Sequence, residues 1–163
     1  MIQIARGVTA LNHALFGCAK WLIYAIVVLM LWEVASRYAF NAPTAWAPEL
    51  ATLIFGPFFL MGGPYLLHMG GHVAVDVLSE RATGRTAAIL HLVGLLLAAI
   101  FGAILLWFSA PLVIQSFQYG ETSYSAWNPV IWPAKAVLPF ASLLLILQAL
   151  ADAVFALQTQ EAV

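Results

Sequence analysis

Two opposite charges stand one helical turn apart in a long apolar stretch. Glu33 and Arg37 are separated by four residues, the spacing at which side chains on one helix face meet. A charge at the bilayer centre costs about 2.5–3.5 kcal/mol on insertion scales, so it needs a partner or a function. The available chemistry is a proton or ion relay at Glu33, an anion site at Arg37, or a structural pair. Because no second carboxylate accompanies them in the stretch, we expect Glu33 and Arg37 to form a structural pair. The protein should then tolerate reversal of both charges better than reversal of either one alone.

Two further acidic residues are candidates for contact with a partner. Glu49 follows Pro48 in the first turn of a second apolar stretch, where the helix dipole favours a carboxylate by about 0.3–1 kcal/mol. Glu121 opens a polar segment that has serines but no histidine nearby to activate one as a nucleophile. We therefore expect no catalytic residues. We expect an outward docking surface made of Trp46, Glu49, Glu121 and Trp127.

The histidines allow two kinds of cofactor site. His68 and His72 have the i,i+4 spacing of a helical metal pair, but the glycines at 70 and 71 should break the helix between them. A metal site also needs more ligands than these two. His68 and His91 could instead lie at similar depth on adjacent helices and ligate a haem. Solvated interfacial histidines are the simpler interpretation, so we expect no metal and no other cofactor.

The composition places these residues in a membrane. Of 163 residues, 64% are hydrophobic and 8% are charged, whereas soluble domains carry about 25% charged residues. The formal net charge of −1 provides no basic surface, so nucleic acid is excluded as a partner. The single cysteine, Cys18, excludes a disulfide framework and dithiol exchange. The lipid bilayer is therefore the expected environment.

Uncharged runs predict the helices that position these residues. A helix needs about 20 apolar residues to cross the hydrocarbon core. We predict an all-α integral membrane protein, a single domain over residues 1–163 with four transmembrane helices. The predicted spans are about 21–40, 47–67, 86–115 and 134–157.

Charge asymmetry predicts the orientation of the spans. Arg6 and Lys20 precede the first predicted span, and Arg81 and Arg85 lie in the middle loop. The opposite side has fewer basic residues, so both termini are expected in the cytoplasm. Residues 1–17 place apolar side chains at helical spacing and predict an amphipathic helix at the interface.

Five segments of the sequence carry a resemblance to a known family. They are Arg37-Tyr38-Ala39-Phe40-Asn41, Trp46-Ala47-Pro48-Glu49-Leu50, Gly71-His72-Val73-Ala74-Val75-Asp76, Gly120-Glu121-Thr122-Ser123, and Trp132-Pro133-Ala134-Lys135 with Pro139. In their order and spacing, more than in any single segment, they resemble the DctQ-like small membrane subunit of tripartite ATP-independent periplasmic (TRAP) transporters. The sequence departs from the family at Pro48, where a second acidic residue is common, and at Leu67-His68-Met69, where a basic residue is common.

The resemblance implies a multi-pass subunit of the bacterial inner membrane, without transport chemistry of its own. In such systems a soluble periplasmic binding protein captures the substrate, commonly an organic acid, and a large permease subunit moves it with a sodium gradient. The small subunit is expected to brace the large one and to help dock the binding protein. The resembling segments add Gly71, His72 and Asp76 to the candidate subunit contacts, beside Glu33 and Arg37.

Two other functions remain open at this point. One is a haem-bearing membrane anchor of a respiratory enzyme, which would use His68 and His91. The other is a small stand-alone exporter that couples transport to protons at Glu33. In none of these interpretations does the chain itself catalyse a chemical reaction.

Overall fold

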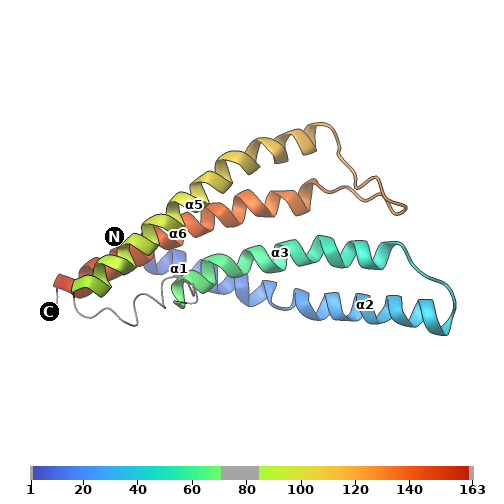
Figure 1. Cartoon of the computed structure of the whole chain (residues 1–163), viewed down its shortest axis with the longest axis horizontal. Helices are drawn as coiled ribbons and strands as arrows, with labels where there is room; N and C mark the ends of the chain where they lie inside the picture. The colour runs from blue at the N-terminus through green and yellow to red at the C-terminus, as the bar shows by residue number, and fades with distance from the viewer. Residues whose placement is uncertain (1, 71–84, 162–163) are drawn as a thin grey trace.

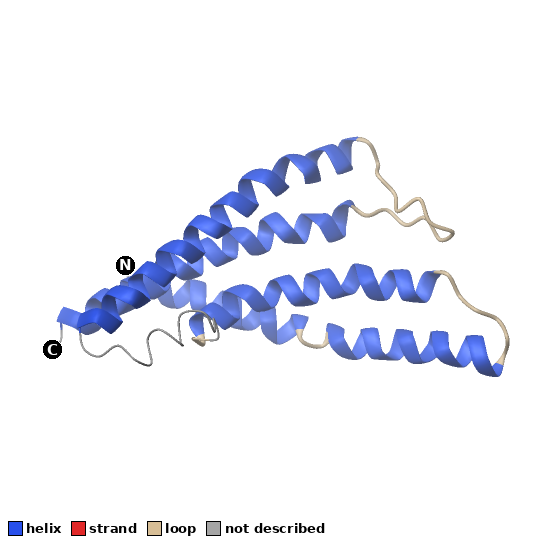
Figure 2. Ribbon diagram, viewed as in Figure 1, coloured by secondary structure: helices blue, strands red, loops and turns tan. Residues whose placement is uncertain are grey.

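The chain folds into long helices. The computed structural model describes residues 2–70 and 85–161 (Figures 1 and 2). The helices are α1 (Ile2–Ala19), α2 (Leu22–Ala39), α3 (Trp46–His68), α5 (Arg85–Gln118) and α6 (Trp132–Glu161). Among these residues the β-structure is limited to an isolated bridge between Thr122 and Val130. The all-α prediction is confirmed.

Within residues 2–70 and 85–161, four helical stretches are long and apolar enough to cross a membrane, the number that the sequence predicts. They are Ile2–Ala39, Trp46–His68, Thr86–Gln118 and Trp132–Gln158. The first includes both α1 and α2, which are interrupted only at Lys20 and Trp21. The N-terminal helix is thus confirmed as a helix, whereas its position at the interface stays a prediction.

Helix α6 is the centre of the assembly. It packs against α1, α3 and α5, and α3 also packs against α1 and α2. Among the described elements α5 packs on α6 alone, so one helix joins the α5–α6 hairpin to the rest. Figure 1 shows the α2–α3 and α5–α6 hairpins diverging toward their connecting loops. Helix α1 begins and helix α6 ends toward the opposite end of the molecule.

Proline and glycine shape the helices locally. Pro57 and Pro64 lie inside α3, where neighbouring helices can compensate for the amide hydrogens that proline lacks. Helix α3 ends at His68, and Gly70 follows it with a φ of +71°, which confirms the predicted break. Helix α5 ends similarly: Gly120 has a φ of +56° and its amide donates to the carbonyl of Phe117. Each of these left-handed glycines lies two residues beyond the last residue of its helix.

Small residues allow α1 to pack closely. Ala5, Asn12 and Ala19 form its buried face. A Cβ added at Gly62 of α3 would lie 3.6 Å from Cε2 of Phe16, and the Phe16 ring stacks on Tyr65 with centroids 4.4 Å apart. Close packing of this kind holds membrane helices together, because lipid provides no hydrophobic driving force between them.

Candidate functional site

The Glu33–Arg37 pair forms, and it fastens a loop. Oε1 of Glu33 accepts hydrogen bonds from Nε of Arg37, at 3.0 Å, and from its Nη2. Oε2 accepts from the backbone amide of Thr44, at 2.9 Å, and from the Thr44 hydroxyl. Glu33 is buried, whereas the Arg37 side chain is half exposed. The carboxylate therefore anchors the α2–α3 loop to α2, and its two oxygens are both engaged in structural bonds.

The bonds to Thr44 change the result expected from charge reversal. In the double variant Glu33→Arg/Arg37→Glu, the arginine at position 33 offers no acceptor to the Thr44 amide or hydroxyl. The double variant restores the opposite charges but not the acceptors for Thr44, so we expect it to recover only part of the unfolding temperature that Glu33→Arg loses, measured by thermal unfolding in detergent. Thr44→Val should lower the midpoint of thermal unfolding by less than Glu33→Arg does. Thr52→Val is its matched control, since the exposed Thr52 hydroxyl bonds only to the Pro48 carbonyl of its own helix. Full recovery in the double variant would contradict this role of Thr44.

The α5–α6 loop is fastened at its base. Nζ of Lys135 donates to Oε2 of Glu121 at 2.5 Å. This bond holds the pKa of the Glu121 carboxyl below its ordinary value, so the carboxylate is ionised at neutral pH. The amide of Ile131 donates to the Glu121 carbonyl at 3.1 Å, next to the bridge between Thr122 and Val130. The two ends of the loop are therefore hydrogen-bonded to each other where they leave the helices.

A second bond joins this loop to the other hairpin. The hydroxyl of Ser125 donates to Oε2 of Glu49, in the first turn of α3, at 2.5 Å. Glu49 forms no salt bridge with any of the described residues, whereas Glu33 and Glu121 each pair with a cation. Trp46 and Trp127, the aromatic members of the predicted docking surface, are 38% and 40% exposed. Among the described residues, Glu49 is thus a carboxylate without a cation partner, and its bond to Ser125 joins the start of α3 to the loop that carries Trp127.

A buried polar network lies far from this surface, near the other end of the helices. Gln148 of α6 is fully buried, and its Oε1 accepts from Nδ2 of Asn12 at 2.7 Å. Its Nε2 donates to Oγ1 of Thr9, at 3.1 Å, and to Oδ1 of Asp152, at 3.0 Å. Nδ1 of His68 lies 2.7 Å from the same Asp152 oxygen. The network therefore connects α1, α3 and α6.

Sequence reasoning missed this network. Its one available indication was the i,i+4 spacing of Gln148 and Asp152 in an otherwise apolar run, which places two polar side chains on one helix face. The network also gives Nδ1 of His68, a histidine that the sequence suggests as a candidate ligand, a carboxylate partner. Gly71, His72 and Asp76 lie outside the described residues.

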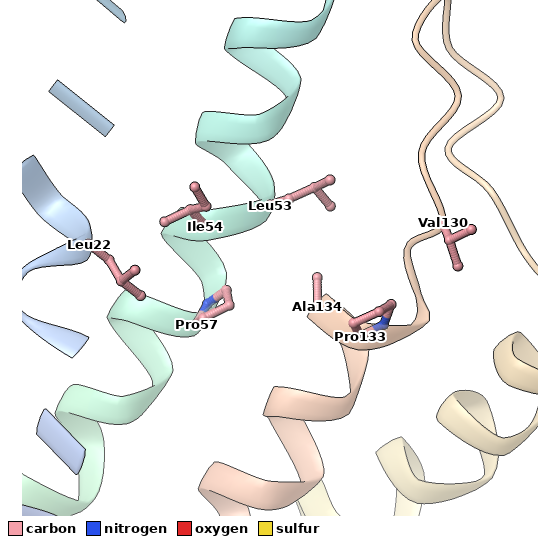
Figure 3. Close-up of a pocket in the computed structure, with 7 residues that line it drawn as sticks. All are labelled: Leu22, Leu53, Ile54, Pro57, Val130, Pro133 and Ala134. Atoms are coloured by element: carbon pink, nitrogen blue, oxygen red, sulfur yellow. The ribbon is translucent and has the colours of Figure 1, made fainter. Parts of the chain in front are cut away.

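Two apolar recesses separate the hairpins. A recess of about 340 Å³ lies between α2, α3 and the start of α6, with Pro57 and Ala134 on opposite walls (Figure 3). A groove of about 540 Å³ runs between α3, α5 and α6, with His91 among its otherwise mainly apolar lining residues. Such surfaces suit lipid chains or apolar helices rather than a polar substrate.

Comparison with known proteins places these features in a family context. A family model described as the DctQ component of tripartite ATP-independent periplasmic transporters matches residues 26–159. A curated relative, the sialic acid TRAP transporter small permease protein SiaQ of Vibrio cholerae serotype O1, is 28% identical over 60 residues. This alignment covers 37% of the chain and 35% of the relative, so the chain spans about a third of the length of the relative it matches. The family model, by contrast, extends over α3, α5 and most of α2 and α6.

Proposed function

The chain belongs to the DctQ component family of tripartite ATP-independent periplasmic transporters, and from this premise we propose that it is the small permease subunit of such a transporter. The family match over residues 26–159 is the observation that carries this function. A DctQ component is part of a transporter and not an enzyme, and the four apolar helical stretches make this one a multi-pass membrane protein. We place it in the bacterial inner membrane with both termini in the cytoplasm.

The subunit braces a large permease subunit in this proposal. Helix α5 packs only on α6 among the described elements, which leaves large apolar side chains exposed along it, including Phe101, Trp107 and Phe108. Helix α2 also exposes apolar side chains, such as Val28 and Leu31. In a membrane these faces meet lipid or another subunit, and a large permease beside α5 or α2 would cover them.

The same proposal includes docking of a periplasmic substrate-binding protein. Glu49 supports it, because its carboxylate has no cation partner in the part of the chain that the structure describes and can attract a basic side chain of an approaching protein. Trp46 and Trp127 provide aromatic contact area of the kind enriched at binding hot spots. Glu121 contributes by holding the base of the loop that carries Ser125 and Trp127.

The transported substrate is, in this proposal, an organic acid taken up with a sodium gradient. The support is the family resemblance, and the relative from Vibrio cholerae is itself named for sialic acid. We prefer this function to a haem-bearing anchor or a stand-alone exporter. The family match favours a transporter subunit over a haem-bearing anchor. Both oxygens of Glu33 are occupied by structural bonds, which leaves little freedom for proton exchange.

The proposed function predicts a dependence of uptake on this chain. We expect it to co-purify with a large permease subunit, and we expect its deletion to abolish sodium-driven uptake while the soluble protein still binds substrate. Uptake by reconstituted vesicles and calorimetry of the soluble protein measure the two results separately. Uptake that continues without the chain would contradict the proposal.

Docking has its own test within the same system. Glu49→Arg should weaken binding of the substrate-binding protein to the permease complex by about tenfold, because it places a cation where we expect another cation to approach. Trp127→Ala should weaken it as well. Trp21→Ala, an exposed tryptophan at the start of α2, is the matched control and should bind normally.

A further inference from the structure

Tyr124 has a backbone conformation that its residue type disfavours. Its φ is +53°, in the left-handed region where Cβ is crowded for most residues. The other described positions with positive φ are Asn41, Gly70, Gly120 and Asn128, all of them residue types that adopt this conformation readily. Tyr124 is therefore the exception, since asparagine or glycine would form the same turn with less strain. Strain that persists in this way is often associated with function.

Hydrogen bonds hold this conformation in place. The amide of Tyr124 donates to Oδ1 of Asn128 at 3.0 Å, and the amide of Asn128 donates to Oγ of Ser125 at 2.9 Å. Oγ of Ser123 lies 2.8 Å from Oγ of Ser125, and the Ser123 amide donates to the carbonyl of Pro129 at 3.0 Å. The turn is therefore already formed in the isolated chain, so a partner would not need to order it.

The Tyr124 side chain projects away from these bonds. It is 86% exposed, and among the described residues its ring and hydroxyl contact no hydrogen-bond or aromatic partner. Exposed Tyr38 and Tyr119 lie at the ends of α2 and α5, where aromatic residues commonly meet the lipid headgroups. Tyr124 lies instead on a loop that extends beyond the ends of α5 and α6 (Figure 1).

The surroundings of Tyr124 favour a protein partner over lipid. Its neighbours in the turn are the hydroxyls and amides of Ser123, Ser125 and Asn128, which suit a hydrated surface. Ser125 also bonds to Glu49, which makes the turn continuous with the docking surface of Trp46, Glu49, Glu121 and Trp127. A rigid turn that displays one large amphipathic ring matches the tyrosine anchors of protein interfaces, which lose little conformational entropy on binding.

We propose that Tyr124 is the anchor by which this surface recognises the soluble binding protein, with its ring inserted into a recess of that protein. The proposal rests on the docking function proposed above and names the residue that dominates it. The complementary recess offers apolar or cationic side chains to the ring and an acceptor to the hydroxyl.

The test uses the opposite effects of one residue on stability and on binding. Tyr124→Asn and Tyr124→Gly should raise the thermal midpoint of the two-subunit permease complex by about 2 °C, because they relieve the left-handed strain. The same variants should weaken binding of the system's purified substrate-binding protein by about tenfold or more, measured by surface plasmon resonance on nanodiscs. Tyr124→Phe keeps the ring and should stay closer to wild type. Tyr119→Asn, which removes a tyrosine of similar exposure, is the matched control and should not change binding.

Three outcomes would overturn the proposal. If Tyr124→Asn binds as tightly as wild type, Tyr124 is not the anchor, while the docking function stands. If the binding protein does not bind the wild-type complex at all, both proposals fail. In the third, the fluorescence that Tyr124→Trp adds to that of the six native tryptophans, taken as the difference from wild type, is quenched by brominated lipids and not altered by the binding protein. That result would assign the residue to the membrane interface. Insensitivity to brominated lipid together with a blue shift on adding the binding protein would support the anchor.

Discussion

Gln148→Leu is expected to destabilise the protein by about 3 kcal/mol and to release α1 from the bundle. The glutamine side chain is fully buried and joins Asn12 and Thr9 of α1 to Asp152 of α6. Leucine matches its size but leaves the Nδ2 group of Asn12 buried without a partner, and each such group costs about 1–3 kcal/mol. Thermal unfolding in detergent measures the loss, and hydrogen exchange of residues 2–19 measures the release of α1.

The control and the rescue for Gln148 follow from the same bonds. Gln118→Leu makes the same chemical change at an exposed position at the end of α5 and should be close to neutral. The double variant Asn12→Leu/Gln148→Leu removes both partners of the shortest bond and should be more stable than Gln148→Leu alone. If Gln148→Leu costs no more than Gln118→Leu, the network does not hold α1.

The sequence determines the helices better than it determines their polar contacts. Long uncharged runs predict the four apolar helices directly, because an apolar length of this kind has few alternatives to crossing a bilayer. The i,i+4 spacing also predicts the Glu33–Arg37 bond, since both residues lie on one turn of a single helix. Contacts that depend only on the periodicity of one helix are therefore accessible without a structure.

Contacts between elements were not accessible in the same way. The third partner of the Glu33–Arg37 pair, Thr44, lies across a turn, and the bond between Gln148 and Asn12 joins residues 136 positions apart. Helix periodicity shows that Gln148 lies on a polar face but gives no indication of which helix covers that face. The same holds for the proposed docking surface: the sequence suggests Glu49 as a contact, but the bond from Ser125 depends on how the two hairpins pack.

Gly102→Ala is expected to destabilise the packing of α5 by about 2 kcal/mol, although alanine is the better helix former. A Cβ at position 102 would lie 2.9 Å from Cγ1 of Ile146 and 3.1 Å from the Ser142 carbonyl oxygen. The side chain can move, but the carbonyl belongs to the backbone of α6, so the helices must separate. Because α5 packs on no other described helix, separation here weakens its whole attachment.

A second glycine distinguishes the effect of close packing from that of helix propensity, because alanine there should change the stability in the opposite direction. A Cβ at Gly63 of α3 would meet no heavy atom within 4 Å, so Gly63→Ala should be neutral or stabilising by up to about 1 kcal/mol. Ile146→Ala in the Gly102→Ala background should restore only part of the loss, because it removes one of the two close contacts and leaves the Ser142 carbonyl in place. Thermal unfolding of the three variants and the wild type in one detergent provides the comparison. If Gly102→Ala and Gly63→Ala shift the unfolding midpoint equally, α5 and α6 do not approach as closely at Gly102 as this geometry requires. The contacts that attach α5 to α6 must then be distributed along the helix.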